Sequence, residues 1–275
     1  MCRLFGLLSP IALNASQHLL EDPCSLYIQG NVDPERLQSD GWGIGFYGGG
    51  RSHLIKSHRP VYEEYERFAS AVQRANSKVI LAHIRRASNP RKLPREKIIS
   101  TGNSQPFGHE RYLFAHNGTI TIPDEVAESL GEWKRRIGGA NDSEVYFWYI
   151  LKEVTRGASF PDALKRFEKA LTSLWLENRE KHLDKDRPYI GLNALFSDGE
   201  RLYAYCKYQK EDETEESLCL KDQLAFQMSY LTSPERLVVA SEKTNTAEDW
   251  KLLKSGHLLT GQIKQERVVV DLQEI

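Results

Sequence analysis

The sequence predicts an α+β fold in which β-sheets pack against a layer of helices. Short apolar or alternating segments typical of strands fill the first part of the chain and the part after Asp186. Between them lie two segments with helical periodicity, residues 145–156 and 160–179. Strands followed by helices and then by strands again are typical of an α+β domain.

The first predicted elements are strands and one short helix. Residues 2–9 form an apolar strand, in which Gly6 leaves room for a close approach. A short helix broken at Pro23 is expected over residues 16–29. The stretch SDGWGIGFY at 39–47 has alternate glycines, which suits a strand with one bare face and starts a hairpin through a Gly-Gly-Gly turn into residues 52–56.

The middle of the chain alternates helices, strands and one long loop. We expect a helix at 61–76, a buried strand at 78–84, a basic loop at 85–105, and short strands at 112–116 and 119–122. The dipeptide between those short strands, Asn117-Gly118, is typical of a hairpin turn. Asn141, with Glu144 three residues later, has the spacing of a capping box that begins the helix at 145–156.

The last third of the chain reads as strands. Their expected positions are 189–197, 201–208, 224–230, 237–241, 257–260 and 264–271, with a hairpin turn at Asp198-Gly199. The acidic run 211–216 is expected to be a solvated loop.

Composition excludes several classes of function. The formal net charge is −1, so no nucleic-acid partner is expected. No apolar run approaches the roughly 18–20 residues that span a bilayer, so no membrane partner is expected. The four cysteines, at positions 2, 24, 206 and 219, have neither zinc-site spacing nor a dense disulfide pattern. We therefore expect reduced cysteines, no metal and a cytoplasmic location.

Cys2 directly follows Met1. If Met1 is removed, residue 2 carries both a thiol and a free α-amine, and the amine can take the proton of the thiol. Their ordinary pKa values, about 8.5 and about 7.7–8.0, make that transfer nearly balanced. Two structural interpretations stand beside this one: a buried cysteine in a strand, and a secretory signal starting at Arg3, which Ser9 and Pro10 interrupt.

Three further positions combine a chemical interpretation with a structural one. Arg85 ends an apolar strand and could hold a carboxylate, or could begin a basic surface loop. The Asn117 amide and the Gly118 N–H could donate to an oxyanion, although the local pattern favours the hairpin turn. Asp142 could bind a substrate ammonium group or belong to a helix cap.

Taken together and in order, these segments resemble the class II glutamine amidotransferases, whose glutaminase domain is an N-terminal nucleophile hydrolase. The matching segments are MCRLFG, SDGWGIGFY, AHIRRAS, NSQPF, FAHNGTI, NDSEV and VVASEK. The opening also resembles small stand-alone members, including the γ-glutamyl amidohydrolase of ergothioneine synthesis and the amidase subunit of a glutathione degradation complex.

The resemblance implies a fold and a set of roles. It implies a four-layer αββα sandwich of two antiparallel sheets in a single domain over residues 2–275. Cys2 would be the nucleophile, Asn117 and Gly118 the oxyanion donors, Arg85 the substrate carboxylate site and Asp142 the ammonium site. No cofactor is implied.

The resemblance leaves the substrate open. Arg86-Ala87-Ser88-Asn89 departs from the tryptophan, threonine and histidine of many family members, so the resemblance assigns the substrate carboxylate to Arg85 alone. The substrate is glutamine, with ammonia passed to a separate synthase, or a γ-glutamyl conjugate cleaved alone or with a partner amidase subunit. A third alternative is a non-catalytic γ-glutamyl-binding regulatory subunit. The loop at 86–104 has the length and position of a lid.

Overall fold

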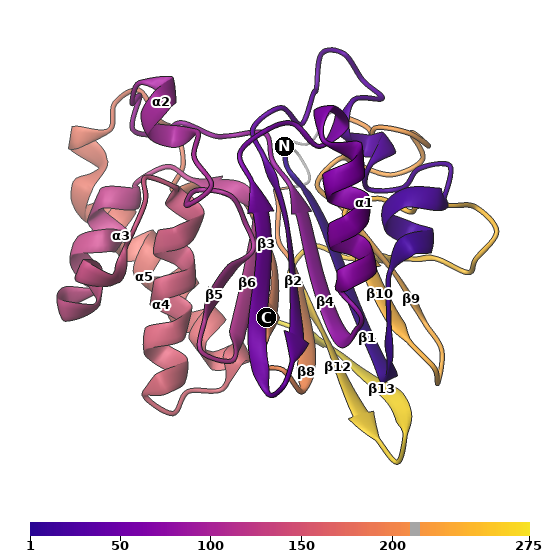
Figure 1. Ribbon diagram of the computed structural model, residues 1–275. Helices are drawn as coiled ribbons and strands as arrows, with labels where there is room; N and C mark the ends of the chain where they lie inside the picture. Colours follow the sequence, from indigo (N-terminus) through magenta and orange to yellow (C-terminus); the bar gives the residue numbers. More distant parts are fainter. Residues whose placement is uncertain (210–214) are drawn as a thin grey trace.

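The computed structural model describes residues 1–209 and 215–275. Two antiparallel sheets stack face to face, and helices cover their outer faces (Figure 1). The first sheet has, in spatial order, strands β11 (Lys251–Leu253), β9 (Met228–Thr232), β10 (Leu237–Ala240), β1 (Arg3–Leu13), β4 (Ser77–Ile84), β2 (Trp42–Gly48) and β3 (Arg51–Ser57). The second has β13 (Arg267–Glu274), β12 (His257–Lys264), β8 (Arg201–Cys206), β7 (Tyr189–Ser197), β6 (Tyr112–Ile120) and β5 (Phe107–His109).

The helices complete four layers. Helix α1 (Tyr65–Arg74) packs on the first sheet, and α3 (Pro123–Ser129), α4 (Asp142–Thr155) and α5 (Phe160–Asn178) lie on the side of the second (Figure 1). This arrangement confirms the expected α+β class and the αββα sandwich. The short helix α2 (Arg95–Ile98) lies in the loop that follows β4. None of the helices within the described ranges has the length and apolar character needed to cross a bilayer.

Three apolar clusters hold the layers together. One fills the space between the sheets, one lies between the first sheet and α1, and one lies between the second sheet and α4 and α5. In β1, Leu4 and Leu8 face the other sheet, whereas Phe5 and Leu7 face α1. This two-residue alternation follows from the pleat of the strand. Both faces of β1 are therefore buried, because the second sheet covers one face and α1 covers the other.

Most predicted elements are present with shifted ends. The expected helix at 16–29 is a π-helical turn (Gln17–Glu21) and a 3-10 turn (Ile28–Gly30), and that at 61–76 is a 3-10 turn (Val61–Glu63) followed by α1. Strand β11 was not predicted, and the turn between β12 and β13 lies at Gln265 and Glu266, which have positive φ. Asn141 caps α4 as expected, because its side chain accepts from Ser143 N at 2.9 Å. Most of the acidic run 211–216 lies outside the described residues.

The hairpin turn expected at Asn117-Gly118 is wrong. Both residues lie inside the single strand β6, where Asn117 pairs with Asn193 and Gly118 with Leu192 of β7. The register shifts only after Gly118, at Thr119. Pairing with β7 continues through both residues and outweighs the turn preference of the dipeptide, which is a local preference only.

The expectation that all four cysteines are reduced is also wrong. Cys24 and Cys219 form a disulfide across 195 residues of sequence, with Cα atoms 5.9 Å apart. Cys2 and Cys206 are free and buried. The pairing depends on the tertiary fold, because no local spacing links the two positions. The cysteine content therefore no longer supports a cytoplasmic location.

Candidate active site

The strand pleat brings three of the predicted site residues to one end of the space between the sheets. Cys2 lies on the same side of β1 as Leu4, and Arg85 continues the side of β4 that carries Leu81. Asn117 continues the side of β6 that carries Leu113. Successive side chains alternate across a strand. The side chains of Cys2, Arg85 and Asn117 therefore point into the same space between the sheets.

A cavity of about 310 Å³ lies at this end of the sandwich. It is lined by Met1, Cys2, Arg86, Ala87, Ser88, Asn117, Gly118, Thr119, Ile190, Glu215 and Phe226. The cavity thus joins the nucleophile expected on β1 to both oxyanion donors expected on β6.

The Cys2 thiol is buried beside this cavity and donates to the carbonyl oxygen of Arg86 at 3.3 Å. Burial raises the pKa of the thiol, while the nearby N-terminal amine, the hydrogen bond and the Arg85 guanidinium lower it. Burial also lowers the pKa of the Met1 amine to about 6. The Met1 amine is therefore largely unprotonated at neutral pH.

Asn117 is buried, and neither its Nδ2 nor its Oδ1 has a hydrogen-bond partner among the described residues. Buried side-chain amides almost always have partners, so an unpartnered one at a cavity calls for an explanation. A bound oxyanion would accept from Nδ2. The neighbouring Gly118 has no room for a side chain, because an added Cβ would lie 2.0 Å from the Gly191 oxygen.

Arg85 is buried close to the cavity but does not line it. Its guanidinium donates to the Ile98 carbonyl at 2.8 Å. Burial lowers the pKa of Arg85, and the charges of Cys2, Asp40 and Asp142 raise it. The guanidinium also lies 3.5 Å from the Asp40 carbonyl oxygen, so backbone carbonyls hold it at this end of the sandwich.

Asp142 begins α4 and is also buried behind the cavity wall. One carboxylate oxygen accepts from Ile120 N at 2.7 Å, and the other accepts from the Ser88 hydroxyl at 3.0 Å. Ser88 itself lines the cavity, so it separates the carboxylate from that space.

Sequence reasoning missed several residues that build this end of the molecule. The Asp40 carboxylate accepts from Ala87 N at 2.7 Å and from the Arg95 guanidinium at 2.6 Å, which fixes the chain just after Arg85. Asp40 could have been singled out from the sequence, because it lies in the SDGWGIGFY segment that matches the family. Glu215 and Phe226 come to the cavity from distant sequence, and no local pattern marked them.

Among the residues that the structure describes, two groups of side chains each bring three potential metal ligands together, and neither group lines the cavity. One consists of His18, Asp22 and Glu248, and the other of Cys24, Cys219 and Glu242. In the second, the sulfurs are bonded to each other, and the Glu242 carboxylate accepts from the backbone. A metal would compete with bonds that are already made.

The family model of glutamine amidotransferases class-II matches residues 1–271. The chain belongs to the class-II glutamine amidotransferases. The resemblance seen in the sequence is confirmed, and the chain is an enzyme that acts on amide bonds.

The chain is also similar to two curated proteins. An uncharacterized protein of Methanocaldococcus jannaschii is 28% identical over 287 residues, which cover 94% of this chain and 68% of that protein. A γ-glutamyl-hercynylcysteine sulfoxide hydrolase of Mycobacterium tuberculosis is 30% identical over 125 residues, 44% of this chain. That match spans 50% of the length of the hydrolase.

Solved structures share the fold. A glutamine aminotransferase class-II domain protein of Silicibacter pomeroyi aligns with a TM-score of 0.61 and 22% identity over 98% of both chains. The glutamine phosphoribosylpyrophosphate amidotransferase of B. subtilis aligns with a TM-score of 0.59 and 15% identity, over 98% of this chain and 49% of that one. At these identities the likeness concerns the fold.

Proposed function

We propose that the protein hydrolyses the γ-glutamyl amide bond of glutamine or of a γ-glutamyl conjugate. The observation that supports this most directly is the shared cavity of the Cys2 thiol and the unpartnered Asn117 amide. A thiol nucleophile and a free donor in one cavity are the two parts that acyl transfer requires.

The nucleophile becomes competent when the Met1–Cys2 peptide bond is cut. Until then the Cys2 nitrogen is an amide and cannot take a proton. After the cut, the new Cys2 amine lies at the buried end of the cavity, where burial already lowers the pKa of the Met1 amine to about 6. The amine accepts the thiol proton, and the thiolate attacks the side-chain carbonyl of the substrate.

The oxyanion of the tetrahedral intermediate accepts from Asn117 Nδ2 and from the Gly118 N–H. The protonated Cys2 amine gives its proton to the departing nitrogen as the C–N bond breaks, which leaves a γ-glutamyl thioester. Water then attacks the thioester and releases glutamate and the free thiol. Removal of one oxyanion donor is expected to reduce turnover by about 10²–10³-fold.

The charged head of the substrate would lie toward Arg85 and Asp142, with the Ser88 hydroxyl turning away from the Asp142 carboxylate to admit it. Arg85 would bind the α-carboxylate and Asp142 the α-ammonium group. Both side chains are buried and fixed by hydrogen bonds to backbone atoms, at Ile98 and Ile120 respectively. A head of one cation and one anion fits a pair of opposite fixed charges.

The proposal includes two alternative substrates, glutamine and a γ-glutamyl conjugate. Glutamine hydrolysis would supply ammonia to a separate synthase. The relative that hydrolyses a γ-glutamyl-hercynylcysteine sulfoxide supports cleavage of a γ-glutamyl conjugate, alone or with a partner amidase subunit.

A substrate panel tests the proposal. Processed wild-type protein is incubated with glutamine and with γ-glutamyl peptides, and glutamate and ammonia release are measured. Cys2→Ala is expected to abolish glutamate release from every substrate, since no other group replaces the thiolate. Cys206→Ala, which changes the other free and buried cysteine, is the control. Unchanged turnover in Cys2→Ala would contradict the mechanism, and saturable binding without turnover by the wild type would indicate a regulatory subunit.

A further inference from the structure

One wall of the cavity is formed by a segment remote from the nucleophile in sequence, residues 215–227, here called the wall segment. It contributes Glu215 and Phe226 to the cavity lining. The segment folds back on itself, since Ala225 N donates to the Glu215 oxygen at 2.9 Å and Glu216 bridges to Leu224. Movement at its tip would therefore reach both lining residues.

The wall segment touches the strands that carry the proposed catalytic groups. Arg3, next to the nucleophile, donates to the Ala225 carbonyl at 3.1 Å. The Phe226 ring packs on Gly191, where an added Cβ would lie 2.7 Å from the ring. The Gly191 oxygen in turn lies against Gly118, the proposed oxyanion donor. Phe226 thus lies on the Gly118 side of the cavity, where the proposed function places the bond that breaks.

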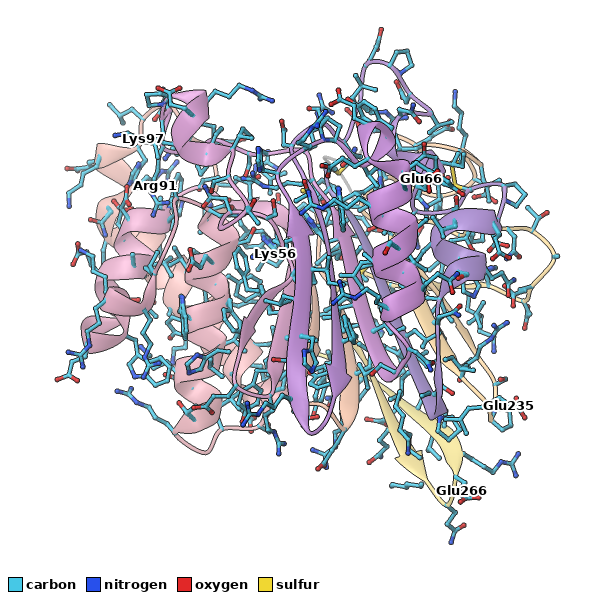
Figure 2. The ribbon with its side chains drawn as sticks, viewed as in Figure 1. Lys56, Glu66, Arg91, Lys97, Glu235 and Glu266 are labelled. Atoms are coloured by element: carbon cyan, nitrogen blue, oxygen red, sulfur yellow. A yellow bond between two sulfur atoms is a disulfide. The ribbon has the colours of Figure 1, made fainter. Side chains whose placement is uncertain are left out.

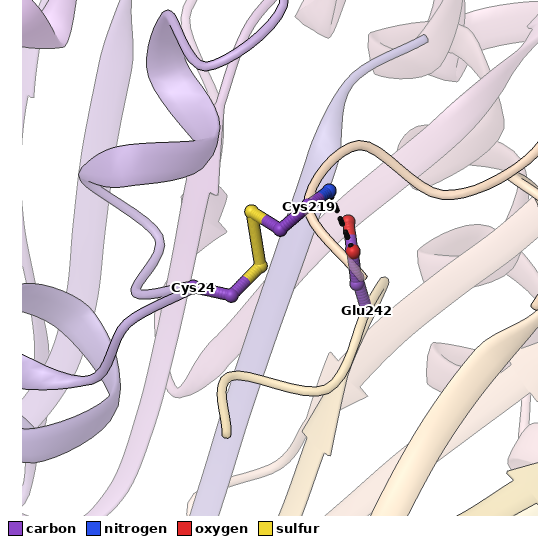
Figure 3. Close-up of side chains that lie close together, drawn as sticks. All are labelled: Cys24, Cys219 and Glu242. Atoms are coloured by element: carbon purple, nitrogen blue, oxygen red, sulfur yellow. Dashed lines mark hydrogen bonds between the residues drawn. A yellow bond between two sulfur atoms is a disulfide. The ribbon is translucent and has the colours of Figure 1, made fainter. Parts of the chain in front are cut away.

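Its tip is fastened in two ways. The Glu242 carboxylate accepts from the backbone N–H groups of Leu218, Cys219 and Leu220 at 2.7–2.8 Å. The Cys24–Cys219 disulfide ties the same turn to the segment after the π-helical turn, and Figure 3 shows it beside Glu242. Cys24 is itself held, because its N–H donates to the Thr244 oxygen at 2.9 Å. The disulfide is the covalent part of this fastening.

We propose that the wall segment recognises the amine leaving group, and that thiol–disulfide exchange at Cys24–Cys219 controls this recognition. The proposal rests on the proposed function, because it names the side of the same cavity that receives the departing amine. Phe226 and Ile190 present apolar surface there, which suits an aromatic or otherwise bulky amine more than ammonia. Reduction leaves the tip of the wall segment held only by the Glu242 hydrogen bonds, so the tip moves more freely and the apolar surface at Phe226 is less well ordered.

A dithiol reductant supplies the two electrons that reduce the Cys24–Cys219 disulfide. Its thiolate attacks the Cys219 sulfur, whose residue is half-buried, whereas Cys24 is fully buried. Cys24 leaves as a thiolate and takes up a proton. The second thiol of the reductant then releases Cys219, so the protein gains two thiols and the reductant becomes its own disulfide.

The test compares a large and a small leaving group. Oxidised wild type, the Cys24→Ser/Cys219→Ser double variant and Phe226→Ala are assayed with γ-glutamyl-p-nitroanilide and with glutamine. The measured quantity is kcat/KM for γ-glutamyl-p-nitroanilide divided by kcat/KM for glutamine. This ratio is expected to fall by about fivefold or more in both variants, because contacts along a coupled segment are lost. Wild type reduced with dithiothreitol is the matched comparison for the double variant, because it loses the Cys24–Cys219 bond and keeps both side chains.

Two further measurements make the result decisive. Hydrogen exchange over residues 215–227 is expected to rise when wild type is reduced in a dithiothreitol redox buffer, in step with the appearance of alkylatable Cys219 thiol. An unchanged or increased kcat/KM ratio in the double variant, or unchanged exchange on reduction, would overturn the proposal. Absence of turnover of every γ-glutamyl substrate by wild type would instead contradict the proposed function, and the exchange measurement would still decide whether the disulfide fastens the wall.

Discussion

At Gly118 the backbones of β6 and β7 leave no space for a side chain. An added Cβ would lie 2.0 Å from the Gly191 oxygen and 2.7 Å from the His116 ring. The His116 ring is itself held by the Ser143 hydroxyl at 2.9 Å and cannot swing away freely. Substitution here must therefore move the strand that carries the proposed oxyanion donors.

We predict that Gly118→Ala lowers kcat by about 10²-fold or more, because the donor moves away from the oxyanion. It should also destabilise the fold by about 1–3 kcal/mol through overpacking. Steady-state kinetics and urea unfolding measure the two effects. Gly102→Ala, where the nearest atom lies 3.7 Å from the added Cβ, is the control. Equal kinetics in the two variants would contradict this role of Gly118.

The pH dependence of activity is the second prediction at this scale. Burial lowers the pKa of the Met1 amine to about 6, and we expect the Cys2 amine to experience the same burial once it is free. A base with a lowered pKa is active above that pKa and loses activity as the pH falls through it. The kcat/KM for glutamine should therefore rise between about pH 5 and 7 and then level off. An acid limb centred near pH 8, the ordinary value for an α-amine, would contradict this expectation.

At the scale of elements, the loop after β4 contains only the short helix α2 and is fixed mainly by contacts of charged side chains. Asp40, just before β2, holds Ala87 N and the Arg95 guanidinium. Arg91, on the same loop, donates to Asp124 and to the Ala140 carbonyl. Arg91 and Lys97 of this loop lie far from the turn that carries Glu266, at the other end of the molecule (Figure 2). The loop therefore connects the first sheet to the helical side at the end that contains the cavity.

We predict that Asp40→Asn raises KM for glutamine by roughly tenfold, because a hydrogen bond to a charged group contributes about 1.5–3 kcal/mol. The loss loosens the chain directly after Arg85, which the proposal assigns to the substrate carboxylate. Asp124→Asn removes another carboxylate that pairs with an arginine of the same loop, at an exposed position, and is the control. Equal KM values in the two variants would show that Asp40 does not position this segment.

At the scale of the whole molecule, the disulfide joins two segments separated by 195 residues. A crosslink that closes so long a loop mainly restricts the unfolded chain. Its contribution to folding is separate from its position beside the cavity wall. The two effects can therefore be measured independently.

We predict that the Cys24→Ser/Cys219→Ser variant is less stable than oxidised wild type by about 2–4 kcal/mol. Urea unfolding under non-reducing conditions gives the difference, and wild type unfolded with dithiothreitol should match the variant. Coincident unfolding curves for wild type with and without the reductant would contradict the prediction.

Local patterns in the sequence predicted many of the elements, because the signals of strands and helices are local. The strand at 189–197 agrees with β7, and the Asn141 cap is where the pattern placed it. The hairpin at Asn117-Gly118 was wrong for the same reason, since the local preference of a dipeptide takes no account of a neighbouring strand. The motifs of residues 2, 85, 117 and 142 predicted the family, which the match over residues 1–271 confirms.

The sequence by itself determined the α+β class, the family and the residues around which a site could form. Only the tertiary structure decided which of them share one cavity, since pleat alternation and sheet stacking bring β1 and β6 together while Arg85 and Asp142 remain behind the wall. It also decided the Cys24–Cys219 pair and the arrival of Glu215 and Phe226 at that cavity. These contacts join residues far apart in the chain, and their formation depends on packing of the whole fold rather than on any local pattern.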